Sequence, residues 1–413
     1  RLSTFRNLLS GQVEWRGSAV SVTGTAWNLW REETLDDREG EVGSGNSWTR
    51  AEIGNTGGRV TATWAPKAWL VAGLTLGARH DSFADEDLVV ESDRTNRGRM
   101  SDTGSASADF RFFGDRLTIS PVLAATLLDN RLIGEVSDRV GGGADTPVVD
   151  GSVDPRLGVL LRPASWLAFR ANGGRYLRPP DLTELFGDSG SLHGNPELLP
   201  ERGWSADFGA RSTLKKGPVL GGSVDLSAFW LVSENRIIYV QNSQRTLYPV
   251  NFGNTWVQGI EAALEVDLLS WVDSQTSLTW TLSRNLTEGS QAANNELPRT
   301  PSLEVWQATS VHWRNVIRIG HTFAYTAPNY WDATNLYLSA PREVHGLFLK
   351  LKPTPRWPEI AVDCLNLTDT MTAVVPQNPA DPEDTSRMVT AVTDYVSFPL
   401  PGRTLLASVR CAF

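Results

Sequence analysis

The sequence has few of the residues from which reactive centres are commonly built. It contains two cysteines and five histidines among 413 residues, and the histidines form no cluster along the chain. Two cysteines exclude a disulfide-rich scaffold. The phosphate-binding G-x-x-x-x-G-K-[ST] motif, the H-E-x-x-H motif and zinc-finger spacings of Cys and His do not occur. We therefore expect no enzymatic activity, no cofactor and no metal site.

Long apolar runs are also missing. The uncharged stretches Ala68–Ala78 and Leu117–Leu128 have 11 and 12 residues. A membrane-spanning helix needs about 20 apolar residues, so a helical membrane protein is excluded. A strand of a membrane β-barrel crosses with about 9–11 residues, and only every second one must be apolar. The barrel class of membrane protein therefore stays open.

Positive charge is scarce as well. The formal net charge is −9, and no block of Lys and Arg stands out. Nucleic-acid-binding proteins usually carry such a block. We therefore expect no nucleic-acid partner.

The pattern that is present is alternation of apolar and polar residues with period 2, which is typical of half-buried strands. In 256–268, Ile260, Leu264 and Leu268 alternate with polar or small residues such as Glu261. Both cysteines, Cys364 and Cys411, lie on the apolar parity of their segments, and we expect them to act as small apolar groups. About 17 segments carry this pattern: 18–31, 58–65, 68–80, 99–113, 116–129, 155–163, 166–177, 204–214, 224–231, 256–268, 275–285, 300–313, 316–327, 343–352, 358–368, 386–398 and 403–413.

The connections between these segments alternate between short and long. Short ones, such as Pro66-Lys67 and Gly114-Asp115, have only a few residues. The long polar ones are about 32–57, 81–98, 130–152, 178–202, 286–299, 328–342 and 369–385. Short turns at one end and long loops at the other are typical of outer-membrane barrels. The predicted fold is all-β, an antiparallel up-and-down transmembrane β-barrel with about 16–18 strands present.

Tryptophan placement supports this prediction, because amphipathic aromatic residues gather at the membrane–water boundary. We expect eight tryptophans at the short-turn ends of their strands: Trp15, Trp64, Trp69, Trp166, Trp204, Trp271, Trp313 and Trp357. The last segment, 403–413, alternates and ends in Phe413, which resembles the signal read by the barrel-assembly machinery.

Several segments from residue 175 onward resemble, in order, the barrel of the TonB-dependent receptors. The first is Arg175-Tyr176-Leu177-Arg178-Pro179-Pro180-Asp181-Leu182-Thr183-Glu184-Leu185-Phe186-Gly187, and the second is Gly194-Asn195-Pro196-Glu197-Leu198-Leu199-Pro200-Glu201. The others are Val250-Asn251-Phe252-Gly253-Asn254 with Gly259-Ile260-Glu261, then Leu297-Pro298-Arg299-Thr300-Pro301, Asn366-Leu367-Thr368-Asp369 and Pro401-Gly402-Arg403. Residues 1–174 carry only the barrel pattern.

The resemblance implies gated import through the Gram-negative outer membrane. Such a receptor takes up a scarce solute, a metal chelate such as a ferric siderophore or cobalamin, with energy from the TonB complex. Its surroundings would be outer-membrane lipid and lipopolysaccharide, and we expect a monomer. Family barrels have 22 strands and an N-terminal plug that contacts TonB. We therefore expect residues 1–413 to be one barrel domain that lacks the plug and some early strands.

Solute contact is expected on an external aromatic loop. Tyr325, Asn329, Tyr330 and Trp331 form the most aromatic loop candidate, and Tyr or Trp rings stack well on flat ligands. An upper aromatic girdle at the membrane boundary explains the same residues equally well.

Other features of the sequence are compatible with alternatives to import. The rivals are a passive porin-like channel and a β protein that binds carbohydrate through its many tryptophans. Gly187-Asp188-Ser189 resembles the nucleophile block of GDS-type esterases, but the Asp-x-x-His pair of those enzymes is missing. The acidic segments Asp81–Asp87 and Glu32–Glu41 could hold Ca²⁺, although solvated loop charge explains them as well.

Overall fold

The structure is a computed structural model of the whole chain. It describes residues 2–39, 47–89, 95–133, 148–187, 192–213, 215–241, 247–314, 316–354, 357–379, 385–393 and 399–411.

Nearly all regular structure in the described residues is strand, and 17 strands belong to one hydrogen-bonded sheet. In chain order these are β1 (Leu2–Arg16), β2 (Val20–Asp37), β3 (Ser47–Lys67), β4 (Leu70–Asp87), β5 (Thr95–Phe112), β6 (Leu117–Ile133), β7 (Val148–Ala164), β8 (Leu167–Arg178), β9 (Glu201–Thr213), β10 (Val219–Glu234), β13 (Thr255–Leu268), β14 (Val272–Asn285), β15 (Leu303–Trp313), β16 (Ile317–Thr326), β17 (Arg342–Leu351), β18 (Glu359–Leu365) and β21 (Thr404–Arg410). Two hairpins lie outside this sheet, β11 (Ile237–Gln241) with β12 (Leu247–Asn251) and β19 (Thr372–Pro376) with β20 (Arg387–Ala391).

The helix α1 (Leu182–Phe186) has five residues. Across the described ranges, the structure holds no helix with the length and apolar character needed to cross a membrane.

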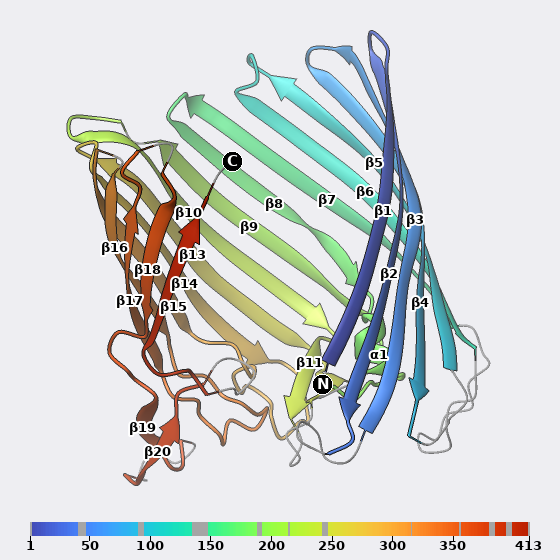
Figure 1. Cartoon of the computed structure of the whole chain (residues 1–413). Coiled ribbons are helices and arrows are strands. Elements are labelled where there is room, and N and C mark those ends of the chain that lie inside the picture. The colour runs from blue at the N-terminus through green and yellow to red at the C-terminus, as the bar shows by residue number, and fades with distance from the viewer. Residues whose placement is uncertain are drawn as a thin grey trace. The chain divides into compact units, whose positions relative to one another are not determined.

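The chain divides into two compact units. Unit 1 comprises Arg1–Leu160, Asn172–Ser205 and Ser233–Phe252. Its strands β1 to β6 pair with their chain neighbours in antiparallel order, as Figure 1 shows in blue and cyan. The α1 segment and the β11–β12 hairpin also belong to this unit.

Unit 2 comprises Leu161–Ala171, Ala206–Val232 and Gly253–Phe413. Here β13 to β18 pair in sequence, and β21 completes the series by pairing with β18. Each of these pairs is antiparallel and joins strands that follow one another along the wall. The up-and-down antiparallel pattern predicted from the sequence is therefore confirmed within each unit.

Alternation gives each sheet segment two unlike faces. In β4, Leu74 and Leu76 point to one face, and Thr75 and Arg79 to the other, because successive side chains in a strand point to opposite sides. We call these the apolar face and the polar face. Large side chains on the apolar face are exposed in both units: Val13, Val60, Leu74, Leu76, Leu127, Leu264, Ile319, Leu347, Leu349, Val362 and Leu405. Exposed apolar side chains in this number require an apolar solvent.

Seven of the eight tryptophans lie beside short turns and are between 46% and 60% exposed. The exception is Trp204, for which the prediction was wrong. Trp204 lies three residues after β9 begins at Glu201, at the end of the strand that follows the long connection from β8. The direction of this strand could be read from the sequence, because the long connection 178–202 directly precedes it.

The predicted number of strands agrees with the sheet, but two segments differ. Residues 2–16 form β1, although no strand was predicted there. The sequence of β1 places Leu8 and Leu9 side by side, which interrupts the alternation. The segment 386–398 was predicted as a wall strand, yet its residues 387–391 form β20, which pairs with β19 outside the main sheet. Cys364 lies on the apolar face as predicted, in register with Leu347 and Leu405.

A charge on the apolar face should destabilise the barrel far more than the same charge on the polar face. Leu264→Arg in the middle of β13 should lower the free energy of unfolding by about 2–4 kcal/mol, because Arg would lie near the bilayer midplane. The matched control is Ala263→Arg, which places the same charge one residue earlier on the polar face. Denaturant titration of the protein in lipid vesicles measures both. Equal losses would contradict the assignment of the two faces.

Candidate functional site

The predicted solute-contacting residues lie at and beyond the end of β16. Tyr325 is the penultimate residue of β16, in register with Val305 of β15 and Glu343 of β17. Its parity is that of Ile319, so Tyr325 belongs to the apolar face. Asn329, Tyr330 and Trp331 lie in the connection 327–341, which we call the aromatic loop. The structure therefore groups three of the four predicted residues and sets Tyr325 apart from them; solute contact by all four stays a prediction.

The aromatic loop is closed by its own backbone. The carbonyl of Asn329 accepts from the N–H of Ser339 at 2.8 Å, and the N–H of Asn329 donates to the Ser339 hydroxyl at 3.0 Å. The Trp331 N–H donates to the carbonyl of Tyr337 at 2.8 Å. These hydrogen bonds join the two sides of the loop at two places. A loop held in this way presents its side chains in a fixed geometry.

Asp332 organises the tip of the aromatic loop. Its Oδ1 accepts from the N–H of Tyr337 at 2.8 Å and of Leu336 at 3.1 Å, and its Oδ2 from the N–H of Thr334 at 3.0 Å. The tip leaves Tyr337 68% exposed and Leu336 47% exposed. Tyr337 was not predicted as a candidate. The signal that could have found it is the Asp332-x-Thr334 spacing, since Asp in such a position hydrogen-bonds the backbone two residues on.

Trp331 and Tyr330 are anchored by a neighbouring loop. The guanidinium carbon of Arg299 lies 5.4 Å from the ring centroid of Trp331, within the range of a cation–π contact. The backbone N–H of Arg299 also donates a hydrogen bond to the backbone carbonyl of Tyr330 at 2.7 Å. Burial is the largest cause that raises the pKa of the Tyr330 phenol, and the nearby carboxylate of Glu296 raises it further. Tyr330 is therefore neutral at ordinary pH, and it can both donate and accept a hydrogen bond.

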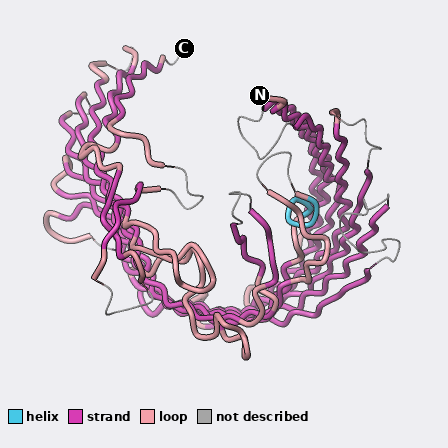
Figure 2. The backbone as a smooth tube through the Cα atoms, turned by 90° about the horizontal axis from the view of Figure 1, so that it is seen from below, coloured by secondary structure: helices cyan, strands magenta, loops and turns pink. Residues whose placement is uncertain are grey.

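In unit 1 a second structure lies on the polar face of the wall. Residues 179–187 and 192–200, here called the α1 segment, carry two of the family-like motifs. Figure 2 shows the helix lying against one face of the neighbouring strands. Phe186 packs on Phe83 of β4 at 5.6 Å between ring centroids, and the guanidinium of Arg97 lies 4.4 Å from the Phe186 ring. Arg99 of β5, which is 2% exposed, donates to the carbonyl of Pro180 at 2.7 Å.

Glu184 is the centre of the α1 segment. It is 1% exposed, and its carboxylate accepts from Arg178 at 2.6 Å, from the Tyr239 hydroxyl at 3.1 Å and from the N–H of Asp181 at 2.7 Å. Burial is the largest cause that raises the pKa of the Tyr239 phenol, and the Glu184 carboxylate raises it further. The Glu-Leu-Phe motif therefore has a structural role: Glu184 joins the end of β8 to the β11 hairpin, while Phe186 fixes the segment to the wall.

A polar cluster in unit 2 lies beside the short turns. Asp273 accepts from Arg318 at 2.5 Å and from the Ser310 hydroxyl at 2.8 Å, and His312 Nδ1 lies 3.4 Å from the other oxygen of Asp273. These residues are on the polar face of β14, β15 and β16: Asp273 and Ser310 lie opposite each other, and so do His312 and Arg318. The cluster shows that the polar face carries paired charges close to the short-turn end.

The acidic segment Asp81–Asp87 belongs to the outer part of β4 instead of the long loop predicted from 81 to 98. Asp81 is paired with Arg79 at 2.9 Å and Asp85 with Arg97 at 2.9 Å. Among the residues that the structure describes, no three His, Cys, Asp or Glu side chains are placed to hold a metal ion. Glu41 of the segment Glu32–Glu41 lies outside the described residues, as do Asp188 and Ser189 of the esterase-like motif.

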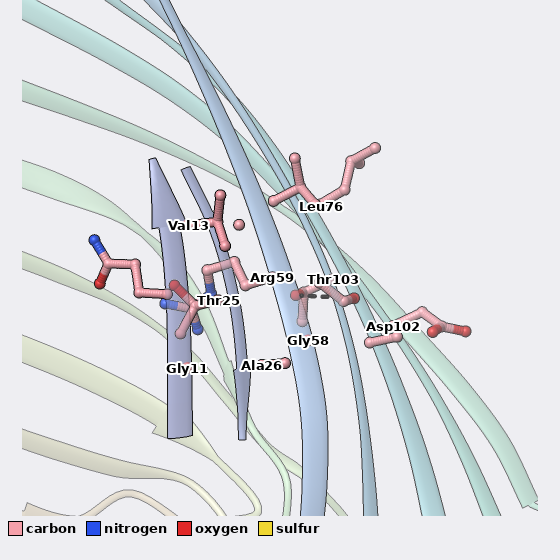
Figure 3. A pocket seen from close by; sticks show the side chains of 14 residues that line it. Gly11, Val13, Thr25, Ala26, Gly58, Arg59, Leu76, Asp102 and Thr103 are labelled. Atoms are coloured by element: carbon pink, nitrogen blue, oxygen red, sulfur yellow. Dashed lines mark hydrogen bonds between the residues drawn. The ribbon is translucent and has the colours of Figure 1, made fainter. Parts of the chain in front are cut away.

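A hollow of about 930 Å³ crosses β1 to β5 in unit 1 (Figure 3). Gly11, Ala26, Gly58 and Ala78 lie in one register row across four of these strands. Their parity is that of Val13 and Leu76, so the hollow lies on the apolar face. It results from the small side chains at these four positions, and the row continues to Asp102 of β5, which also lines the hollow.

Comparison with known proteins connects this geometry to a family. Residues 2–367 match the family model described as TonB dependent receptor-like, beta-barrel. A comparison with curated proteins gave no match. Similar solved structures include the copper transporter OprC, with a TM-score of 0.76, 15% identity and coverage of 99% of this chain and 65% of that chain.

Two further solved structures are similar. The FrpB iron transporter from Neisseria meningitidis has a TM-score of 0.70 and 13% identity, with 98% of this chain and 64% of that chain covered. The ferric yersiniabactin uptake receptor FyuA from Yersinia pestis has a TM-score of 0.66 and 14% identity, with 99% and 61% covered. The chain thus spans less than two thirds of these relatives, and at these identities the likeness is one of fold.

Removing the Glu184 carboxylate should release the α1 segment from the wall. Glu184→Ala leaves the partly buried Arg178 and Tyr239 without their acceptor, which should cost about 1–3 kcal/mol. Hydrogen exchange of the amides in residues 179–187 and 192–201 should become correspondingly faster. Glu197→Ala, an exposed carboxylate in the same segment, is the matched control and should leave exchange unchanged. Unchanged exchange in Glu184→Ala would disprove the anchoring role.

Proposed function

Because this chain belongs to the TonB-dependent receptor β-barrel family, whose barrels lie in the outer membrane, we propose that it is the wall of an active importer. The observation that carries the proposal is the family match over residues 2–367. The two-faced strands fit the role, since the apolar face suits lipid and the polar face suits an aqueous or plug-filled lumen.

A metal chelate is the proposed solute class. The similar structures are by their titles a copper transporter, an iron transporter and a ferric siderophore uptake receptor. A ferric siderophore is the member of this class that we favour, and cobalamin is the alternative. The titles support the class only by family likeness, because less than two thirds of each relative is covered.

The aromatic loop is the proposed contact for that solute. Tyr337 is exposed at a tip fixed by Asp332, and Trp331 is held by Arg299. Aromatic rings in a fixed position can stack on a flat chelator with little loss of side-chain entropy. Asn329 and Tyr330 complete the proposed contact, while Tyr325 would contribute only if the solute reaches the apolar face.

Energy for import is proposed to come from the TonB complex, acting on a plug. The rival is a passive porin-like channel, which would share the barrel but need no energy. The family match favours the importer over the channel and over a carbohydrate-binding β protein.

Uptake should depend on TonB. In cells whose own chelate receptors are deleted, expression of the full-length protein should restore growth on one ferric chelate under iron limitation, and inactivation of TonB should abolish the restored growth. A second experiment tests the alternative solute by supplying cobalamin to a strain that requires it. Growth that persists without TonB would support the passive channel and contradict the proposal.

Truncation of the loop aromatics should weaken solute binding. Trp331→Ala and Tyr337→Ala should each raise Kd about 3- to 10-fold, since a stacked aromatic contact contributes roughly 0.5–1.5 kcal/mol. Tryptophan-fluorescence or calorimetric titration with the transported chelate measures the change. Trp357→Ala, which removes an exposed tryptophan at a short turn, is the control. A Kd that is unchanged in both loop variants would remove the aromatic loop from the binding site.

A further inference from the structure

Lysine is confined to the short-turn ends of the strands. The sequence contains five lysines, Lys67, Lys215, Lys216, Lys350 and Lys352. Lys67 is the last residue of β3 in unit 1, and the other four belong to unit 2. Of these, Lys215 and Lys216 lie between β9 and β10, and Lys350 and Lys352 lie at the end of β17. Short turns of outer-membrane barrels face the periplasm, so every lysine lies at that end.

The short connections of unit 2 carry only positive charge. There are five of them in this unit: 165–166, 214–218, 269–271, 314–316 and 352–358. Together they contain three lysines and two arginines, but no Asp or Glu. The long connections of the same unit, such as 366–403, have more acidic than basic residues. Although the whole chain has a net charge of −9, its short-turn end in unit 2 is therefore basic.

Backbone hydrogen bonds join these short connections into one continuous rim. The N–H of Leu269 donates to the carbonyl of Pro218 at 2.9 Å, and the N–H of His312 donates to the carbonyl of Trp271 at 2.8 Å. Farther along, the N–H of Lys352 donates to the carbonyl of Val316 at 2.8 Å. We call the cations along this line the basic rim: Lys215, Lys216, Arg314 and Lys352.

Arg314 places the basic rim at the boundary of the membrane. Its guanidinium carbon lies 5.2 Å from the ring centroid of Trp313, which is a cation–π distance. Trp313 shares the apolar face of β15 with Val311 and is 59% exposed. Exposed tryptophans on that face gather at the level of the lipid headgroups. Lys352 shares its connection with another exposed tryptophan, Trp357.

The protein does not neutralise the cations of the basic rim. All four are exposed, and none of them takes part in an ion pair among the described residues. The acidic residues near this end, Asp267, Asp273 and Glu359, have the parity of the polar face. Asp273 is moreover paired with Arg318. Cations without a partner at a membrane boundary attract anionic headgroups.

We propose that the basic rim binds the headgroups of anionic glycerophospholipids, such as phosphatidylglycerol, in the leaflet at the short turns. The lysine ammonium groups and the Arg314 guanidinium donate hydrogen bonds to phosphate oxygens. The long side chains of Lys and Arg let the charge reach the headgroup while their methylene groups lie along apolar surface. Trp313 and Trp357 lie beside the glycerol and upper acyl region of the same lipids.

Two other anionic partners fit the basic rim less well. Lipopolysaccharide lies in the opposite leaflet, where the connections of unit 2 are acidic and repel its phosphates. A soluble acidic polymer would be attracted by the charge, but it would leave the exposed rings of Trp313 and Trp357 without an apolar partner. Cations beside membrane-facing tryptophans therefore favour a phospholipid.

Quenching by spin-labelled lipids tests the proposal at the rim itself. The full-length protein, with Cys364 and Cys411 replaced by Ala, carries a fluorophore on Thr354→Cys in the connection 352–358 and is reconstituted in phosphatidylcholine vesicles. Spin-labelled phosphatidylglycerol should quench this fluorophore more strongly than spin-labelled phosphatidylcholine. The difference should shrink in about 1 M NaCl, where the Debye length falls to about 3 Å. Equal quenching by the two lipids at low salt would overturn the proposal.

Neutralising the rim should remove the preference for the anionic lipid. Arg314→Gln or Lys352→Gln should lower the relative association constant of phosphatidylglycerol about fivefold, the equivalent of about 1 kcal/mol per charge at the surface. Lys350→Gln is the matched control, because Lys350 lies on the polar face opposite Arg318 and should leave the constant unchanged. Heat-modifiable gel migration verifies that each variant is folded.

Two results would contradict the assignment of the rim to lipid. One is a preference for phosphatidylglycerol that persists when all four cations of the rim are replaced by Gln. The other is the absence of a lipid preference in a protein that binds polyglutamate through the same four cations, since the partner would then be a soluble acidic polymer.

Discussion

Hydrogen bonding of the backbone in a solvent that cannot take part is the constraint on which this structure depends. In hydrocarbon every N–H and C=O must find a partner within the protein, and strands can do so only by pairing with other strands. The antiparallel series β1 to β6 and β13 to β18 with β21 meets this demand within each unit. The two faces follow from it, because a paired strand sends alternate side chains to lipid and to the polar side.

Most polar side chains of the wall and its loops then lie where they can form hydrogen bonds. On the polar face, Glu184 and Asp273 each collect several donors and bind neighbouring strands together. Above the membrane, Asp332 performs the same role for the aromatic loop. The side chains of Glu343, His345 and His321 depart from this order, since they form a hydrogen-bonded series on the apolar face.

The sequence was sufficient for the fold class because period-2 alternation is a local signal. It failed at β1, where Leu8 and Leu9 break the alternation, and at 386–398, where pairing with β19 decides the outcome and leaves no local trace. The place of Trp204 could have been predicted correctly, because the long connection 178–202 directly precedes β9. The aromatic loop could be located from its composition. The exposure of Tyr337 could not, since it follows from the fold of the tip around Asp332.

Alternate residues of each wall strand face lipid. A cysteine scan of Trp256–Leu268 with an environment-sensitive label, in the protein reconstituted in lipid, tests it most directly. Labels at Ile260, Ala262, Leu264 and Val266 should be quenched by a lipid-soluble quencher. Labels at Glu261, Ala263, Glu265 and Asp267 should be quenched by a water-soluble one. Quenching without this period of two, or water-soluble quenching at the first set, would contradict the account.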